Sequence, residues 1–270
     1  FMKAISEGQE DGGDAARMRM REAYLLAGEI NDLHLSRYTR AVELYHEATV
    51  TFAHETLALI ALKRSSEIFR DKLGNAKKAI ETDKEIIREF PQTPEAAAAK
   101  LRIVKTLLDA RDYEQAVLEG QAFLARPPKG SEAHLFMLIG DALASLERYE
   151  DAAGIYGRIV GEFPKSDYAK LARFEEGNCL VRLGRLDEAL KIFTEVLEIY
   201  PNPDVVRLRI AETRARIERA KHPQTEPEMN WAEIKGLRRS LGKSPGASKN
   251  YRTDQARPSF EQPPIGAFSE

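Results

Sequence analysis

Several kinds of chemistry are excluded by what the sequence lacks. It has one cysteine, Cys179, in 270 residues, so it cannot form an internal disulfide or a zinc site of several cysteines. Its longest apolar run, near residues 57–62, is far shorter than the roughly 20 residues that cross a bilayer. Its formal net charge of -2 provides no strong basic field for nucleic acid. The sequence therefore indicates neither a transmembrane span nor a nucleic-acid partner.

The sequence also lacks a recognisable catalytic, metal or cofactor motif. GDAL at 140–143 lies inside a predicted helix, and LGKS at 241–244 lacks the upstream glycine of a phosphate-binding loop. The five histidines are His34, His46, His54, His134 and His222. No two of them have the i, i+4 spacing that is common among metal ligands on a helix. Cys179 falls where the repeat described below buries small residues, so we expect an inert thiol. We predict no enzyme activity, no metal and no cofactor.

What the sequence does have is an internal repeat built from good helix formers. YEDAAGIYGRIVGEFP at 149–164 overlays LDEALKIFTEVLEIYP at 186–201. In both, an alanine is followed four residues later by an aromatic residue and twelve residues later by a proline. The anchor alanines are 38, 37, 36 and 37 residues apart, at Ala41, Ala79, Ala116, Ala152 and Ala189. Five evenly spaced copies indicate a repeat architecture.

Each copy is predicted to form two amphipathic helices. In the fourth copy, apolar residues at helical spacing predict a first helix over 132–147 and a second over 150–162. Alanine at the anchor lets the paired helices approach closely. We expect Gly140 and Gly177 to do the same where a first helix meets the neighbouring repeat.

The proline of each copy predicts the end of its second helix, because a proline ring cannot continue the hydrogen-bond ladder. The string EFPKSDYA at 162–169 is therefore the joint between two repeats. Ser166 or Asp167 is expected to cap the incoming helix.

The order glycine, alanine, aromatic and proline resembles the tetratricopeptide repeat (TPR), whose usual period is about 34 residues. The resemblance covers residues 17–221. It implies an all-α, right-handed TPR-type α-solenoid of about five helix pairs, with a C-terminal capping helix and an extended tail. The repeats are expected at about 17–53, 54–91, 94–128, 131–164 and 167–201, and the cap at 203–221. The first repeat departs most from the pattern, with Glu29 at the glycine position and Ala53 at the proline position.

The joint between repeats is about three residues longer than in the usual TPR. That variant is similar to the repeats of bacterial envelope proteins, namely the outer-membrane-assembly lipoproteins and the Tol–Pal coordinator family. This likeness implies a protein of the periplasm or the cell envelope.

Both ends of the chain are expected to differ from the repeats. Residues 1–16, with three glycines, indicate a linker, and because the sequence begins with Phe1 we expect a further upstream piece, such as a signal, a lipid anchor or another domain. Residues 222–270 are rich in proline and poor in aliphatic residues, so they are predicted to be disordered or ordered by a partner. A short helix near 230–241 either docks in a partner's groove or packs back on the solenoid, through Trp231, Ile234, Leu237 and Leu241.

A solenoid of this type offers a concave groove lined by the first helix of each pair. On the repeat frame the expected groove-facing residues are Arg64, Leu101, Lys105, Met137, Asp141, Phe174 and Asn178. Apolar anchors between polar groups suit a peptide, although any one of these residues could equally serve packing. Met137 and Phe174 stand where a chaperone-type carboxylate clamp needs polar or basic groups, which disfavours that mode.

These features favour a non-catalytic scaffold for protein–protein interactions, as a structural or assembly subunit of a bacterial cell-envelope complex. Peptide segments would bind in the groove, and the larger complex would bind through the tail. The alternative is a cytoplasmic TPR adaptor or co-chaperone-like peptide-binding module. A third hypothesis is an enzyme or enzyme regulator whose catalytic part precedes Phe1.

Overall fold

The computed structural model describes residues 13–127, 130–222 and 236. Over this part of the chain it contains eleven α-helices, one π-helical segment and no strand. In chain order these are α2 (Asp14–Glu29), η1 (Ile30–His34), α3 (Tyr38–Thr51), α4 (Thr56–Asp71), α5 (Ala76–Glu89), α6 (Pro94–Asp109), α7 (Tyr113–Leu124), α8 (Glu132–Ser145), α9 (Tyr149–Glu162), α10 (Asp167–Arg182), α11 (Leu186–Val196) and α12 (Pro203–Lys221). The chain divides after Cys179, within α10, into two compact units.

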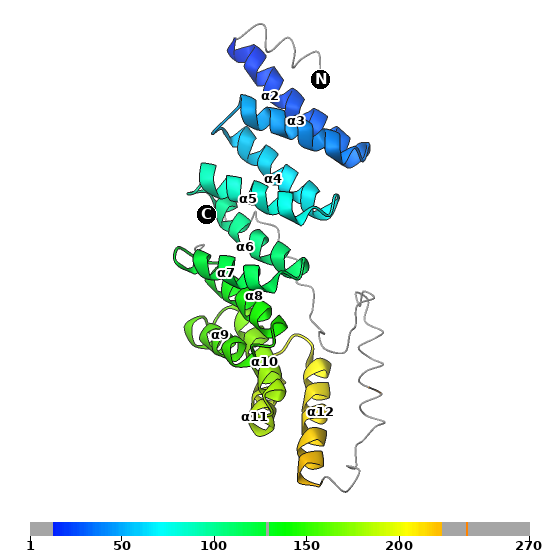
Figure 1. Ribbon diagram of the computed structural model, residues 1–270, viewed down its shortest axis with the longest axis vertical. Coiled ribbons are helices and arrows are strands. Elements are labelled where there is room, and N and C mark those ends of the chain that lie inside the picture. Colours follow the sequence, from blue (N-terminus) through cyan, green and yellow to red (C-terminus); the bar gives the residue numbers. More distant parts are fainter. Residues whose placement is uncertain (1–12, 128–129, 223–235, 237–270) are drawn as a thin grey trace. The chain divides into compact units, whose positions relative to one another are not determined.

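In the first unit, consecutive helices pack on one another in chain order, from α2 and α3 to α8 and α9 (Figure 1). The five anchor alanines of the sequence repeat are all 0% exposed. A larger side chain at these positions would separate the two helices of a pair. The predicted all-α solenoid of stacked helix pairs is confirmed.

The turn within each helix pair repeats with the same spacing as the anchor alanines. The residue five positions before each anchor has a φ between 52° and 78°, and these residues are Ser36, Gly74, Arg111, Glu147 and Gly184. In three of the turns the next residue donates its backbone N–H to a carbonyl five residues earlier, as Arg148 does to Leu143 at 3.0 Å. This closure satisfies carbonyl groups that the end of a helix otherwise leaves unpaired.

The joint EFPKSDYA lies between α9 and α10, as predicted. Helix α9 ends at Glu162, two residues before Pro164. The hydroxyl of Ser166 accepts the backbone N–H of Tyr168 at 3.3 Å, which caps the first turn of α10. Of the two residues expected to cap this helix, Ser166 therefore does so.

Gly140 makes a close contact that differs from the expected one. A Cβ atom at this position would lie 2.6 Å from Cε1 of Tyr156, which is on α9 of the same helix pair. The prediction that Gly140 faces the neighbouring repeat is wrong. Glycine is required because the ring of the aromatic residue four positions after the anchor lies across the backbone of α8.

In the first repeat the equivalent glycine is Gly28, not position 29. The ring of Tyr45 lies over it, and a Cβ on Gly28 would lie 2.7 Å from Cζ of that ring. Gly28 is 13 residues before Ala41, whereas Gly140 is 12 residues before Ala152. The extra residue is accommodated where α2 continues into the π-helical segment Ile30–His34, because a π-turn holds one more residue than an α-turn.

The N-terminal helix begins earlier than expected. Helix α2 starts at Asp14, so three residues of the predicted linker 1–16 are helical. Ala16 is buried in the first helix pair, which gives these residues a packing role. The rest of the linker, residues 1–12, lies outside the described residues.

In the second unit, α12 packs on α11. Its apolar residues Val206, Ile210 and Ile217 are buried, as the spacing of a capping helix requires. The tail from residue 223 lies outside the described residues except for Gly236, so the proposed docking residues Trp231, Ile234, Leu237 and Leu241 stay predictions. None of the described helices is long and apolar enough to cross a membrane.

Candidate peptide-binding groove

A surface pocket of about 220 Å³ lies between α2 and α4, the first helices of the first two repeats. We call it the α2–α4 groove, and it is lined by Met18, Arg21, Glu22, Leu25, Thr56, Leu57 and Ile60. Two of its four large apolar residues are solvent-exposed, Met18 to 63% and Ile60 to 39%. Such exposure of neighbouring apolar side chains is typical of a binding surface.

A charged cluster lies next to the joint between α3 and α4, and it shares Arg21 with the lining of the groove. Arg17 and Arg21 both form ion pairs with Glu55, at 2.6 and 3.3 Å. The two guanidinium groups also lie 5.5 and 6.0 Å from the centre of the buried Phe52 ring. These contacts connect α2 to the residue that precedes α4.

The groove-facing residues predicted from the repeat frame fall into two groups. Arg64, Leu101, Lys105 and Asn178 are partly or fully exposed, whereas Met137, Asp141 and Phe174 are buried. The Asp141 carboxylate accepts the Tyr156 hydroxyl at 2.7 Å, and the amide of Asn178 donates to Glu175 at 3.1 Å. Met137, Asp141 and Phe174 expose little surface to a peptide, because their side chains pack against other residues.

Lys105 lies near His134, a residue that the repeat frame did not identify. It lowers the pKa of His134 after the larger effect of burial, so the imidazole stays neutral at pH 7. His134 stacks on Tyr168, with ring centroids 4.8 Å apart. The sequence could have indicated this stacking, because His134 and Tyr168 each lie near the start of the first helix in two successive repeats.

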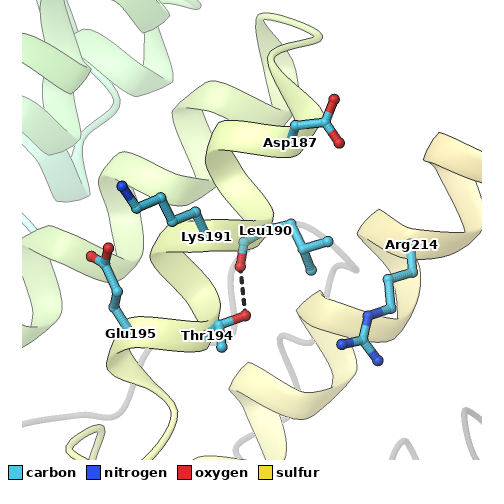
Figure 2. A pocket seen from close by; sticks show the side chains of 6 residues that line it. All are labelled: Asp187, Leu190, Lys191, Thr194, Glu195 and Arg214. Carbon is cyan, nitrogen blue, oxygen red and sulfur yellow. Dashed lines mark hydrogen bonds between the residues drawn. The ribbon is translucent and has the colours of Figure 1, made fainter.

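A second pocket, of about 500 Å³, belongs to the second unit. It is lined by Arg214 of α12 and by five residues of α11, which are Asp187, Leu190, Lys191, Thr194 and Glu195. The Thr194 hydroxyl donates to the carbonyl of Leu190 at 2.8 Å, so it is used within its own helix (Figure 2). Figure 2 shows Leu190 directed toward the helix that carries Arg214, with Lys191 and Glu195 on the other side. This surface lacks the convergent polar groups of a small-molecule site.

The described residues offer no obvious metal site, since they contain no group of three His, Cys, Asp or Glu side chains placed to bind an ion. Cys179 is 3% exposed, as expected for a buried thiol. The α2–α4 groove is also smaller than the roughly 300–1,000 Å³ typical of small-molecule sites. Its exposed apolar lining suits side chains of a peptide.

Comparison with protein families matches the central part of the chain to a known repeat. The family model described as tetratricopeptide repeat matches residues 101–167 and 137–202. No curated protein matches the sequence significantly.

Solved structures share the fold at low sequence identity. The C-terminal part of a TPR repeat-containing protein from Cytophaga hutchinsonii has a TM-score of 0.58 and 14% identity, covering 82% of this chain and 79% of that chain. YrrB, described as a TPR protein with an unusual peptide-binding site, has a TM-score of 0.51 and 20% identity over 73% of this chain and 94% of that chain. MamA from Desulfovibrio magneticus has a TM-score of 0.50 and 18% identity over 66% of this chain and 94% of that chain. The tetratricopeptide repeat model thus matches residues 101–202, and the chain shares the α-solenoid fold of TPR proteins.

Proposed function

We propose that this protein is a non-catalytic scaffold that binds a peptide segment of another protein in the α2–α4 groove. The observation that carries this proposal is the exposure of two apolar side chains, Met18 and Ile60, that line the same groove. Burying large apolar side chains that the fold leaves in water is favourable, at about 25 cal/mol per Å² of apolar surface. A peptide with its own apolar anchor gains this energy on docking.

The shape of the groove favours a peptide over a small molecule. Its walls come from α2 and α4, and the lining includes the charged residues Arg21 and Glu22 besides the apolar ones. This combination of apolar anchors and polar rim is typical of peptide grooves. The peptide-binding site named for YrrB, a protein of the same fold, supports the same use of this fold.

The proposal predicts that one charge in the groove weakens peptide binding. Peptides selected from a random display library on the full chain should bind the Ile60→Asp variant at least about tenfold more weakly, a loss of about 1.4 kcal/mol. Val50→Asp is the matched control, because Val50 is 67% exposed on α3 outside the groove. Fluorescence anisotropy of labelled peptides measures both affinities.

Two results would contradict this assignment. If Ile60→Asp and Val50→Asp bind the selected peptides equally well, the binding site lies elsewhere on the chain. If display yields no binding peptide at all, the scaffold proposal loses its main support. Urea unfolding of Ile60→Asp should change little, because Ile60 is largely outside the core.

More specific roles are part of the same proposal. The exposed members of the predicted set, Arg64, Leu101, Lys105 and Asn178, would extend peptide contacts beyond the α2–α4 groove, and the tail would bind the larger complex. We further propose a bacterial cell-envelope assembly as the setting, supported by the lengthened joints between repeats. A cytoplasmic adaptor is the alternative.

Cell fractionation tests the proposed setting. We expect the protein in the periplasmic or membrane fraction of the source cells, together with envelope proteins that are retained by mild cross-linking. Recovery in the cytosol alone would support the adaptor instead. A cytosolic metabolic enzyme, followed in the same fractions, serves as the control for leakage.

A further inference from the structure

Helix α12 has apolar residues on two opposite sides. Val206 and Ile210 belong to its buried side, and the helix packs on α11. On the other side, Leu208, Ala211 and Ala215 follow one another at the i, i+3, i+7 spacing of a second apolar face, and they are only partly buried. A helix that ends a stack of repeats needs one apolar face and a polar outer face. The second apolar face therefore indicates a further packing partner.

The pocket between α11 and α12 borders this second face. Arg214, which lines the pocket, lies three residues after Ala211, so both project from neighbouring positions on α12. Leu190 of α11 is directed toward the helix that carries Arg214 (Figure 2). We call these residues together the α12 surface, and they are Leu190, Leu208, Ala211, Arg214 and Ala215.

Helix α12 stands where a sixth repeat would begin. Each of the first helices α2, α4, α6 and α8 packs on the helix that follows it in the chain. Among the described residues no second helix follows α12, although the chain continues to residue 270. Residues 222–229 would connect α12 to the segment 230–241, and eight residues are within the usual length of a connection between packed helices.

The segment 230–241 fits this place in length and in pattern. Four of its apolar residues recur at helical spacing along one side, and these are Trp231, Ile234, Leu237 and Leu241. As a helix the segment would be about 18 Å long, within the roughly 28 Å of the 19-residue α12. Gly236, the one described residue of the segment, is helical and exposed, and a Cβ there would meet nothing within 4 Å. Its position is opposite the apolar side, as a docked helix requires.

The charges favour one direction for this helix. Arg214, Arg216 and Arg219, in the second half of α12, are exposed and form no ion pair with other described residues. Residues 223–233 contain three glutamates and no lysine or arginine. A segment that returns along α12 from its C-terminal end places these glutamates beside the unpaired arginines. Complementary charges of this kind contribute little energy but select the orientation of packing.

We propose that residues 230–241 form a helix that packs antiparallel on the α12 surface and completes a sixth helix pair. Trp231 then lies against the C-terminal half of α12, and Leu241 lies against the N-terminal half. The docked helix covers the C-terminal end of the solenoid, so the part of the tail left for a partner begins after residue 241. This inference is independent of the peptide proposed for the α2–α4 groove.

Trp231 is the only tryptophan of the chain, so its fluorescence reports the docking directly. In the full chain its emission should be blue-shifted, and acrylamide should quench it at least about threefold less than in the urea-unfolded chain, because the docked ring is shielded from water. Ala211→Asp, which places a charge on the α12 surface, should restore most of the quenching. Ala220→Asp is the matched control and should change nothing, because Ala220 is exposed on the opposite side of the same helix.

A variant in the tail separates loss of docking from loss of folding. Ile234→Asp should expose Trp231 as much as Ala211→Asp does, while the circular dichroism of the solenoid persists. Gly236→Asp should leave the quenching unchanged, since this position faces solvent. The proposal is overturned if acrylamide quenches Trp231 equally in the native and unfolded chains, or if Ala211→Asp and Ala220→Asp behave alike. Protection that rises with protein concentration would also overturn it, because the occupant would then be a second copy of the chain.

Discussion

Replacing Arg102 with alanine is expected to lower the free energy of unfolding by about 3 kcal/mol, at the lower end of the range for breaking a buried ion pair. Arg102 lies on α6 and pairs with Asp83 on α5, with Nη2 donating to Oδ1 at 2.7 Å. The Asp83 side chain is 1% exposed and that of Arg102 is 17% exposed. Without the guanidinium, the buried carboxylate of Asp83 loses its ion-pair partner.

Urea unfolding followed by circular dichroism measures this loss at two pH values. Burial raises the pKa of Asp83, and Arg102 opposes that rise, so removing Arg102 raises this pKa further. When the pKa of a carboxyl group is higher in the folded than in the unfolded state, the free energy of unfolding falls as the pH rises through that pKa. The deficit of Arg102→Ala should therefore be largest at pH 7 and smaller near pH 4, where Asp83 takes up a proton.

An exposed ion pair provides the control for this experiment. Arg148 pairs with Asp151 at 2.6 Å, and both side chains are more than half exposed. Arg148→Ala should cost less than about 0.5 kcal/mol. Equal losses for the two arginine variants would show that burial of the Asp83–Arg102 pair contributes nothing.

Gly140→Ala and Gly154→Ala should change stability in opposite directions, although they are the same substitution within one helix pair. A methyl group on Gly140 would lie 2.6 Å from the Tyr156 ring, whose hydroxyl is hydrogen-bonded to Asp141. The ring cannot move without breaking that bond, so we expect a loss of about 1–3 kcal/mol. A methyl group on Gly154 meets nothing within 4 Å, so alanine should add about 1 kcal/mol through helix propensity.

The difference between the two alanine variants should thus be about 2–4 kcal/mol, measured by urea unfolding under identical conditions. A stabilised Gly140→Ala would mean that α8 and α9 separate easily and that the glycine has no packing role. Tyr156→Phe combined with Gly140→Ala checks the mechanism. Freed from its hydrogen bond, the ring should adapt and recover part of the loss.

The sequence predicted the repeat architecture because its determinants are local. Ala152 must be small where two helices cross, and Pro164 must follow the end of a helix, whatever surrounds them. These requirements recur at a fixed spacing, so the helix pairs could be predicted from one sequence. The capping role of Ser166 follows from the same short-range logic.

The sequence did not predict which residues of the first helices remain accessible. Met137, Asp141 and Phe174 share a repeat position with exposed residues but are buried, because local helix packing differs from pair to pair. The α2–α4 groove was missed for a related reason. Met18 and Ile60 are 42 residues apart, and only the packing of α2 beside α4 brings them together.

A one-residue insertion shows the limit of the repeat frame. Counting back from Ala41 pointed to Glu29, whereas the π-helical segment moves the contact with Tyr45 to Gly28. Helical periodicity assumes a constant number of residues per turn, and a single wider turn breaks that assumption.

By itself the amino-acid sequence determined that this chain folds into stacked helix pairs, since small residues, helix formers and prolines act within one repeat. Only the tertiary structure decided which side chains form a surface for a partner. Exposure depends on how neighbouring helices cover each residue, and that covering is set by contacts between residues far apart in the chain.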